Sequence, residues 1–302
     1  MADMKLFHLD NDDVSEITGR SVSVEKTLQS LIERHLEKFL GVRFLASEHI
    51  TGKVHGGRID TLGIDENGSP VIIEYKRAQN ENVINQGLFY LDWLLDHKGE
   101  FTLLVIDRFG KEAGEAIEWS SPRLCCIAGD FTKYDEHAVQ QINRNIELIR
   151  YRRYGDSLLL LELVNATTGE PVGSDVGRDG ENQQYKTFVE YLSQSPRMLK
   201  DRYENLRAFI EALGDDIQTK QLKYYIAFRR LKNFACVEVR PQTESILIYV
   251  KLDPKSVVLE PEFTRDVQNI GHYGTGDLEI RIRTDNDLQK AKPLLAKSYE
   301  EN

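Results

Sequence analysis

The chain has 302 residues, of which 40% are hydrophobic and 9% aromatic, which is ordinary for a folded protein long enough for two domains. Its formal net charge of −10 argues against a nucleic-acid-binding surface that covers the whole molecule, but it allows a local basic groove. No apolar run approaches the ~20 residues of a membrane span, the acidic N-terminus lacks the apolar region of a signal peptide, and the three cysteines show no zinc-binding spacing, so we expect a cytoplasmic protein with reduced thiols and no membrane contact.

Hydrophobic periodicity predicts an N-terminal domain over residues 1–165 that begins with a helix over 24–40. The next elements are predicted, in chain order, as strands over 43–51, 58–65 and 70–77, a helix over 81–97, a strand over 101–107, a short helix, a cysteine-containing strand, a helix over 133–146 and a strand over 157–164. The leading order αβββαβ predicts an α/β fold with a mixed sheet flanked by helices.

A stretch rich in Gly, Asn, Asp and Glu predicts a linker over residues 166–184. The remaining residues, 185–302, predict a smaller α+β domain. Its elements are expected as helices over 185–194 and 197–213, strands over 235–240, 245–252 and 279–284, and a closing helix over 286–299.

The most informative pattern is a hairpin that carries Asp60 in its first strand and Glu74 and Lys76 in its second. Two turns are compatible with the sequence between the strands. A three-residue loop over 66–68, with a left-handed Gly68, places Asp60 opposite Glu74 on one face. A two-residue Asn-Gly loop turns Asp60 to the other face. A shared site requires the first loop, or a bulge that compensates for the second.

Two carboxylates in apolar strands are costly unless something neutralises their charge. Mg²⁺ is the natural partner because it prefers oxygen ligands, and it can activate water against a phosphodiester. Lys76 would then position the attacking water or stabilise charge in the transition state. The alternative is a half-buried strand in which Glu74 pairs with Lys76 or Arg77.

Glu25 falls within the apolar stripe of the first helix, whereas Glu33 and Glu37 are predicted to face solvent. Either Glu25 is a first-turn acid favoured by the helix dipole, or it reaches the metal site. In the second helix, Gln86 and Tyr90 are spaced i and i+4 and therefore share a face. For Tyr90 alone, a core position is the favoured interpretation.

Together these residues resemble the PD-(D/E)XK nuclease superfamily over roughly residues 25–93. The signature is Asp60…Glu74-Tyr75-Lys76, with Ile in place of the Pro of "PD". The run from Gln86 to Tyr90 matches the QxxxY element of RecB-like branches. The sequence GRID…IIEYKR…NQGLFYL is similar to the corresponding segments of the NucS-like endonucleases.

The resemblance implies a restriction-endonuclease-like core and a Mg²⁺- or Mn²⁺-dependent endonuclease that cleaves DNA in repair or defence. It implies Asp60 and Glu74 as metal ligands with the Tyr75 carbonyl as a third, and Glu25 as the helix-borne acid, with Glu37 as the runner-up. A homodimer is expected because duplex cleavage needs two sites. The competing interpretation is a non-catalytic module that binds nucleic acid or protein on a nuclease-like fold.

The second domain contains a basic segment with interleaved aromatics, which suits a nucleic-acid surface. The candidate DNA contacts are Lys223, Arg229 and Arg230, together with Arg58 and Arg77 of the first domain. The alternative is an amphipathic helix with a solvated cationic face. The C-terminal part resembles an uncharacterised domain appended to such nuclease-like domains. Its Gly271, Gly274 and Gly276 suggest a plain turn or, as the less favoured alternative, a phosphate-contacting loop.

Overall fold

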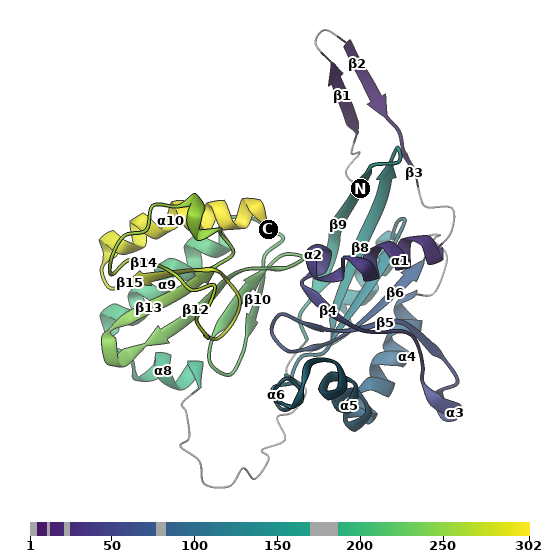
Figure 1. Cartoon of the computed structure of the whole chain (residues 1–302), viewed down its shortest axis with the longest axis horizontal. Helices are drawn as coiled ribbons and strands as arrows, with labels where there is room; N and C mark the ends of the chain where they lie inside the picture. The colour runs from purple at the N-terminus through teal and green to yellow at the C-terminus, as the bar shows by residue number, and fades with distance from the viewer. Residues whose placement is uncertain (1–4, 11–12, 21–24, 77–82, 170–186) are drawn as a thin grey trace. The chain divides into compact units, whose positions relative to one another are not determined.

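The computed structural model describes residues 5–10, 13–20, 25–76, 83–169 and 187–302 (Figure 1). The chain divides into two compact units, Met1–Ser174 and Asp175–Asn302. Arg77 and residues 170–184 of the predicted linker lie outside the described residues. A separate two-stranded sheet, β1 (Leu6–Asp10) with β2 (Asp13–Ile17), belongs to the first unit.

The first unit is built on a seven-stranded mixed sheet of order β3-β8-β7-β6-β5-β4, with β9 paired to β8. Its strands are β3 (Gly19–Arg20), β4 (Val42–Ile50), β5 (Arg58–Asp65), β6 (Pro70–Lys76), β7 (Arg123–Ala128), β8 (Asn145–Tyr154) and β9 (Leu158–Thr167). The pairs β4–β5, β5–β6 and β8–β9 are antiparallel, and β6–β7 and β7–β8 are parallel. The predicted α/β class with a mixed sheet is therefore confirmed.

The helices of this unit are α1 (Glu25–Arg34), α2 (Leu36–Leu40), α3 (Gly52–His55), α4 (Val83–Asp96), α5 (Lys98–Phe109), α6 (Lys111–Glu115) and α7 (Lys133–Gln140). The helices α1 and α4 cover opposite faces of the sheet. Thr61 bonds to Glu33 of α1, whereas the neighbouring Leu62 lies in the core that contains Leu91 of α4. Adjacent strand residues point to opposite faces, so β5 and β6 are covered on both sides.

Two predicted elements of the first unit were wrong. Residues 101–107 form part of α5 rather than a strand: Phe101 and Val105 are buried one helical turn apart, while Leu103 is exposed. A short apolar run does not distinguish these alternatives by periodicity. The predicted helix over 133–146 ends at Gln140, and the strand β8 that follows was missed. The predicted first helix is divided into α1 and α2.

The second unit is a six-stranded antiparallel sheet with helices on one face, in agreement with the predicted α+β pattern (Figure 1). Its sheet order is β10-β11-β12-β13-β15-β14. The strands are β10 (Gln218–Gln221), β11 (Ile226–Arg229), β12 (Asn233–Arg240), β13 (Ser245–Val250), β14 (Thr264–Asp266) and β15 (Leu278–Ile282). The helices are α8 (Phe188–Gln194), α9 (Arg197–Glu211) and α10 (Asp285–Glu301). The basic segment forms β10 and β11, so the amphipathic-helix alternative was wrong.

Candidate functional site

The turn between β5 and β6 has the register that a shared carboxylate site requires. The Asp65 amide donates to the Ser69 carbonyl at 2.8 Å, and Gly68 is left-handed with φ 81°. The three-residue loop over 66–68 is thereby confirmed. Continuing this register along the strands sets Asp60 opposite Glu74. Because side chains alternate along a strand, Lys76 shares the face of Glu74.

Asp60 and Glu74 are linked through each other's strand backbone. The Asp60 amide donates to Glu74 Oε1 at 3.2 Å, and the Tyr75 amide donates to Asp60 Oδ2 at 3.0 Å. Glu74 is 0% exposed. Its second oxygen, Oε2, is buried and has no hydrogen-bond partner among the described residues. A buried carboxylate oxygen in that condition is costly unless a cation or donor approaches it.

Both carboxyl groups have raised pKa values. Burial, followed by repulsion from Asp60, raises the pKa of Glu74 to about 9. Burial also raises the pKa of Asp60, against the opposing effect of its hydrogen bond from the Tyr75 amide. Two neighbouring acids whose ionised forms are unfavourable are stabilised as carboxylates when a cation binds between them.

The start of α1 brings a third acid to the end of β6. Glu25 Oε1 lies 3.7 Å from Lys76 Nζ, and both side chains are partly buried. Glu25 also contributes repulsion to the pKa of Asp60. Glu37, the alternative helix-borne acid, is exposed on α2.

The predicted orientation of Glu33 was wrong. Its carboxylate turns toward the sheet, where Oε1 accepts from Thr61 Oγ1 at 2.6 Å and from Gln29 Nε2 at 3.0 Å. The buried Thr61 hydroxyl supplies a polar partner beneath the helix, which the apolar stripe alone did not reveal.

Gln86 and Tyr90 contact the beginning of β5 rather than the two carboxylates. Gln86 Nε2 donates to the Tyr90 hydroxyl at 3.2 Å, and that hydroxyl accepts from the Arg58 amide at 3.1 Å. Gly57 makes this approach close, because a Cβ there would lie 2.5 Å from the Tyr90 ring. The pair therefore anchors the strand two residues before Asp60.

Sequence analysis missed two residues beside the carboxylates. The buried Gln29 of α1 donates from Nε2 to the Asp60 carbonyl at 2.8 Å. Glu48 of β4 is held by Lys26 at 2.6 Å, and it contributes repulsion to the pKa of Asp60. Gln29 lies four residues after Glu25, on the same helix face, so its polarity within that stripe was a signal available in the sequence.

The predicted DNA contacts have different surroundings. Arg58 is exposed and lies 2.5 Å from a Glu48 oxygen, and Lys223 is exposed above a tyrosine ring. Arg230 is ion-paired with an aspartate at 2.6 Å. The prediction that Arg229 contacts DNA was wrong. Arg229 is only 4% exposed and donates to a backbone carbonyl, so its guanidinium is enclosed within the unit. Arg77 lies outside the described residues.

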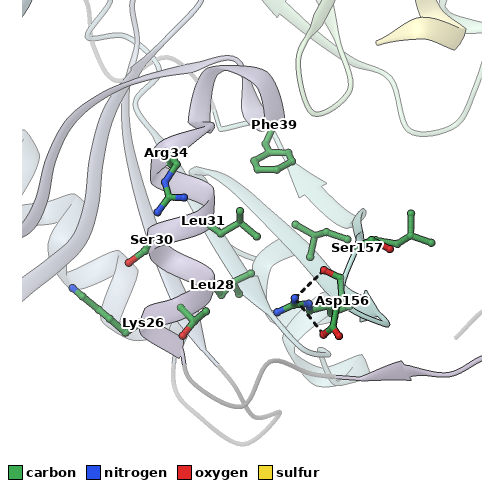
Figure 2. A pocket seen from close by; sticks show the side chains of 12 residues that line it. Lys26, Leu28, Ser30, Leu31, Arg34, Phe39, Asp156 and Ser157 are labelled. Carbon is green, nitrogen blue, oxygen red and sulfur yellow. Dashed lines mark hydrogen bonds and ion pairs between the residues drawn. The ribbon is translucent and has the colours of Figure 1, made fainter.

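A pocket of about 800 Å³ lies between α1 and the turn from β8 to β9 (Figure 2). Figure 2 shows Leu28, Leu31 and Phe39 along it, with Arg34 at the helix and Asp156 at the turn. Its lining does not include Asp60 or Glu74, so this apolar pocket is separate from the carboxylate site. The carboxylate site of Asp60 and Glu74 is therefore identified by its charged groups and not by this pocket.

Across the described ranges, no three His, Cys, Asp or Glu side chains gather closely enough to form a metal-binding group by themselves. The described part of the chain also has no helix long and apolar enough to cross a membrane. The three cysteines are buried thiols that form no disulfide with one another.

Comparisons with known proteins describe the C-terminal unit without assigning an activity. Residues 189–302 match the family model described as "Domain of unknown function (DUF5655)". A relative from Haemophilus influenzae, described as an uncharacterized protein, is 27% identical over 316 aligned residues, which cover 99% of this chain and 100% of the relative. No solved structure matches the chain. The similarity to this relative therefore covers both units of the chain.

Proposed function

We propose that the N-terminal unit is a metal-dependent deoxyribonuclease of the PD-(D/E)XK type. The observation that carries this proposal is the fully buried Glu74 beside Asp60, with one oxygen unsatisfied by the described residues. The element order supports it: apart from the four-residue helix α3 between β4 and β5, the order α1–α2, β4, β5, β6, α4–α6, β7 follows the αβββαβ order expected of that superfamily.

The residues fit a hard divalent cation. Mg²⁺ is bound in proteins by oxygen atoms, commonly by one or two carboxylates with several retained waters. Asp60 and Glu74 would supply the carboxylates, and the Tyr75 carbonyl between Glu74 and Lys76 would supply a third oxygen. When bound, Mg²⁺ or Mn²⁺ would polarise the phosphodiester and lower the pKa of a bound water.

The remaining residues have distinct proposed roles. Lys76 would position the attacking water or stabilise charge on the phosphate in the transition state. Glu25, 3.7 Å from its ammonium, would orient that side chain and add negative charge to the cation site. Gln86 and Tyr90 would be positioning residues, because they act on Asp60 through the backbone of β5.

DNA is the proposed substrate on the strength of the resemblance and of the exposed Arg58 near the site. Cytoplasmic localisation and a homodimer stay predictions. A dimer would present two sites to the two strands of a duplex.

The proposal is tested by incubating the full chain with single-stranded, duplex, mismatched and branched DNA in the presence of Mn²⁺. Wild type should cleave at least one substrate, and Lys76→Ala should lose that cleavage. Lys111→Ala is the matched control, because Lys111 is exposed on α6 and forms an ion pair with its helix neighbour Glu115. Equal cleavage rates for wild type and Lys76→Ala would show that Lys76 has no role in the reaction.

Metal titration by calorimetry separates the nuclease from a non-catalytic binding module. Wild type should bind Mn²⁺ and Asp60→Ala should not. Absence of metal binding in the wild type, together with binding of uncut DNA, would favour the non-catalytic module.

A further inference from the structure

A second charged pocket lies in the C-terminal unit, on the face of its sheet that the helices do not cover. The helices pack on the face that carries Val237, Ile248 and Ile280. Glu238, Tyr249 and Glu279 occupy alternate positions and therefore face the other way. A pocket of about 480 Å³ is present on this second face. It is independent of the carboxylate site in the first unit.

Three arginines from three different strands line the pocket: Arg240 of β12, Arg265 of β14 and Arg281 of β15. The buried Glu279 accepts from Arg265 at 2.6 Å and from Arg281 at 3.2 Å. A guanidinium has five N–H donors, so one bond to Glu279 fixes its direction and leaves other donors for a ligand. Glu279 is therefore a positioning residue for two cations.

The third arginine has a donor that the protein does not use. Arg240 pairs with the buried Glu238 through its terminal nitrogen. Its Nε is buried and finds no hydrogen-bond partner anywhere in the described residues. A buried N–H of a cation without an acceptor is costly, and an anionic ligand would satisfy it. Glu262 also pairs with Arg281 at 3.7 Å and with Arg283 at 2.7 Å. Four arginines therefore face three glutamates, and the cluster carries a net positive charge in a chain whose net charge is −10.

Aromatic rings form another wall of the pocket. His272 stacks on Tyr249 with ring centroids 4.1 Å apart and an interplanar angle of 7°. Tyr273 also lines the pocket and stacks on a second tyrosine at 4.7 Å. Gly274, with φ 78°, lets this loop lie close to β12, because a Cβ there would be 2.6 Å from the Cβ of Cys236. The glycine-containing loop, which connects β14 to β15, is thus packed against the sheet.

We propose that this pocket binds the phosphate monoester of a nucleotide. The arginines suit a phosphate dianion because guanidinium groups bind its oxygens in a bidentate manner. The flat wall of His272 and Tyr273 suits a base, since stacking accepts any base. The nucleotide is either free or the 5′-phosphorylated end of a DNA strand, since both present the same chemistry.

The test is calorimetric titration of the full chain in a buffer with chelator and without phosphate. Without divalent metal no metal-dependent cleavage occurs, so the result does not depend on the nuclease proposal. The ligands are inorganic phosphate, deoxyadenosine 5′-monophosphate, deoxyadenosine, and one oligonucleotide with either a 5′-phosphate or a 5′-hydroxyl. We expect the nucleotide to bind and the nucleoside to bind at least tenfold more weakly. Preference for the phosphorylated oligonucleotide over the mononucleotide would identify a DNA end as the ligand, and the reverse would identify a free nucleotide.

The variants Arg265→Gln and Arg281→Gln should each weaken nucleotide binding at least tenfold. Arg207→Gln is the matched control, because Arg207 pairs with a glutamate on α9 in the helical layer of the same unit. Thermal unfolding checks that each variant remains folded. The proposal is overturned by an absence of binding to every phosphate ligand at concentrations up to about 1 mM. Equal losses in Arg207→Gln and Arg281→Gln would also overturn it.

Discussion

Replacing Glu74 with glutamine should change how the stability of the metal-free protein depends on pH. Glu74 has a folded-state pKa of about 9, against an ordinary value of 4.5. Below pH 4.5 the group is protonated in both states, so the folded state has its full stability. As the pH rises, the unfolded chain ionises first and the free energy of unfolding falls, until both states are ionised above about pH 9.

The size of this effect follows from the shift. Each pH unit between the two pKa values lowers the free energy of unfolding by about 1.4 kcal/mol, so the loss between pH 5 and pH 8 approaches about 4 kcal/mol. Glutamine does not titrate, so Glu74→Gln should lack this component and should be more stable than wild type at pH 8 without metal. Mn²⁺ should reverse the order, because it stabilises only a chain that has the carboxylate.

Urea unfolding at pH 5, 6, 7 and 8, with chelator and with Mn²⁺, measures both effects. The difference between wild type and Glu74→Gln reports this carboxyl group together with its repulsion of Asp60. Glu112→Gln, at an exposed position of α6, is the matched control and should follow wild type throughout. Parallel pH profiles for wild type and Glu74→Gln would refute the argument that Glu74 is a buried, unneutralised carboxyl group.

Three further substitutions test the frame around the site. Gly68→Ala should lower the free energy of unfolding by about 1–2 kcal/mol, because the left-handed backbone at φ 81° disfavours a side chain; urea unfolding measures it. Arg123→Met should cost about 3–5 kcal/mol by removing the positive charge that lies between two buried carboxylates, and stability equal to wild type would contradict this. Gly57→Ala should displace the Tyr90 ring, cost about 1–3 kcal/mol and slow any Mn²⁺-dependent cleavage, which parallel unfolding and cleavage assays would detect.

The sequence predicted the hairpin well because its information is local. Alternating apolar residues define the strands over a few residues, and β5 begins and ends where its periodicity predicted. The register was left open, because the sequence allows both a two-residue and a three-residue loop, and the bond from the Asp65 amide to the Ser69 carbonyl selects the latter. Residues 101–107 were mispredicted because a short apolar run is equally compatible with a buried strand and a packed helix. The strand β8 was missed because it is buried on both faces and carries arginines. Arg150, buried in β8, is stabilised by Asp130 and Glu162, which come from distant positions in the chain.

The candidate site likewise contains residues that local sequence patterns predicted and contacts that they did not. Asp60, Glu74 and Lys76 were predicted from spacing within one hairpin, and Glu25 from a helical wheel. Contacts that join separate elements were not predictable, because the position of α1 over β5 decides them. The bond from Gln29 to the Asp60 carbonyl is one such contact. The inward turn of Glu33 toward Thr61 is another, and it reversed the orientation expected from the helix alone.

Each of the two proposed sites contains a buried glutamate, and the charges of the neighbouring residues determine whether the site attracts a cation or an anion. Glu74 lies beside a second carboxylate, with one oxygen unsatisfied by the described residues, so the negative charge of the acids exceeds the single positive charge of Lys76. Glu279 is covered by two arginines, and each guanidinium has more donors than one carboxylate can accept. The first arrangement therefore attracts a cation and the second an anion. A nuclease that also held a terminal phosphate would use both, with cleavage chemistry in one unit and recognition of a strand end in the other.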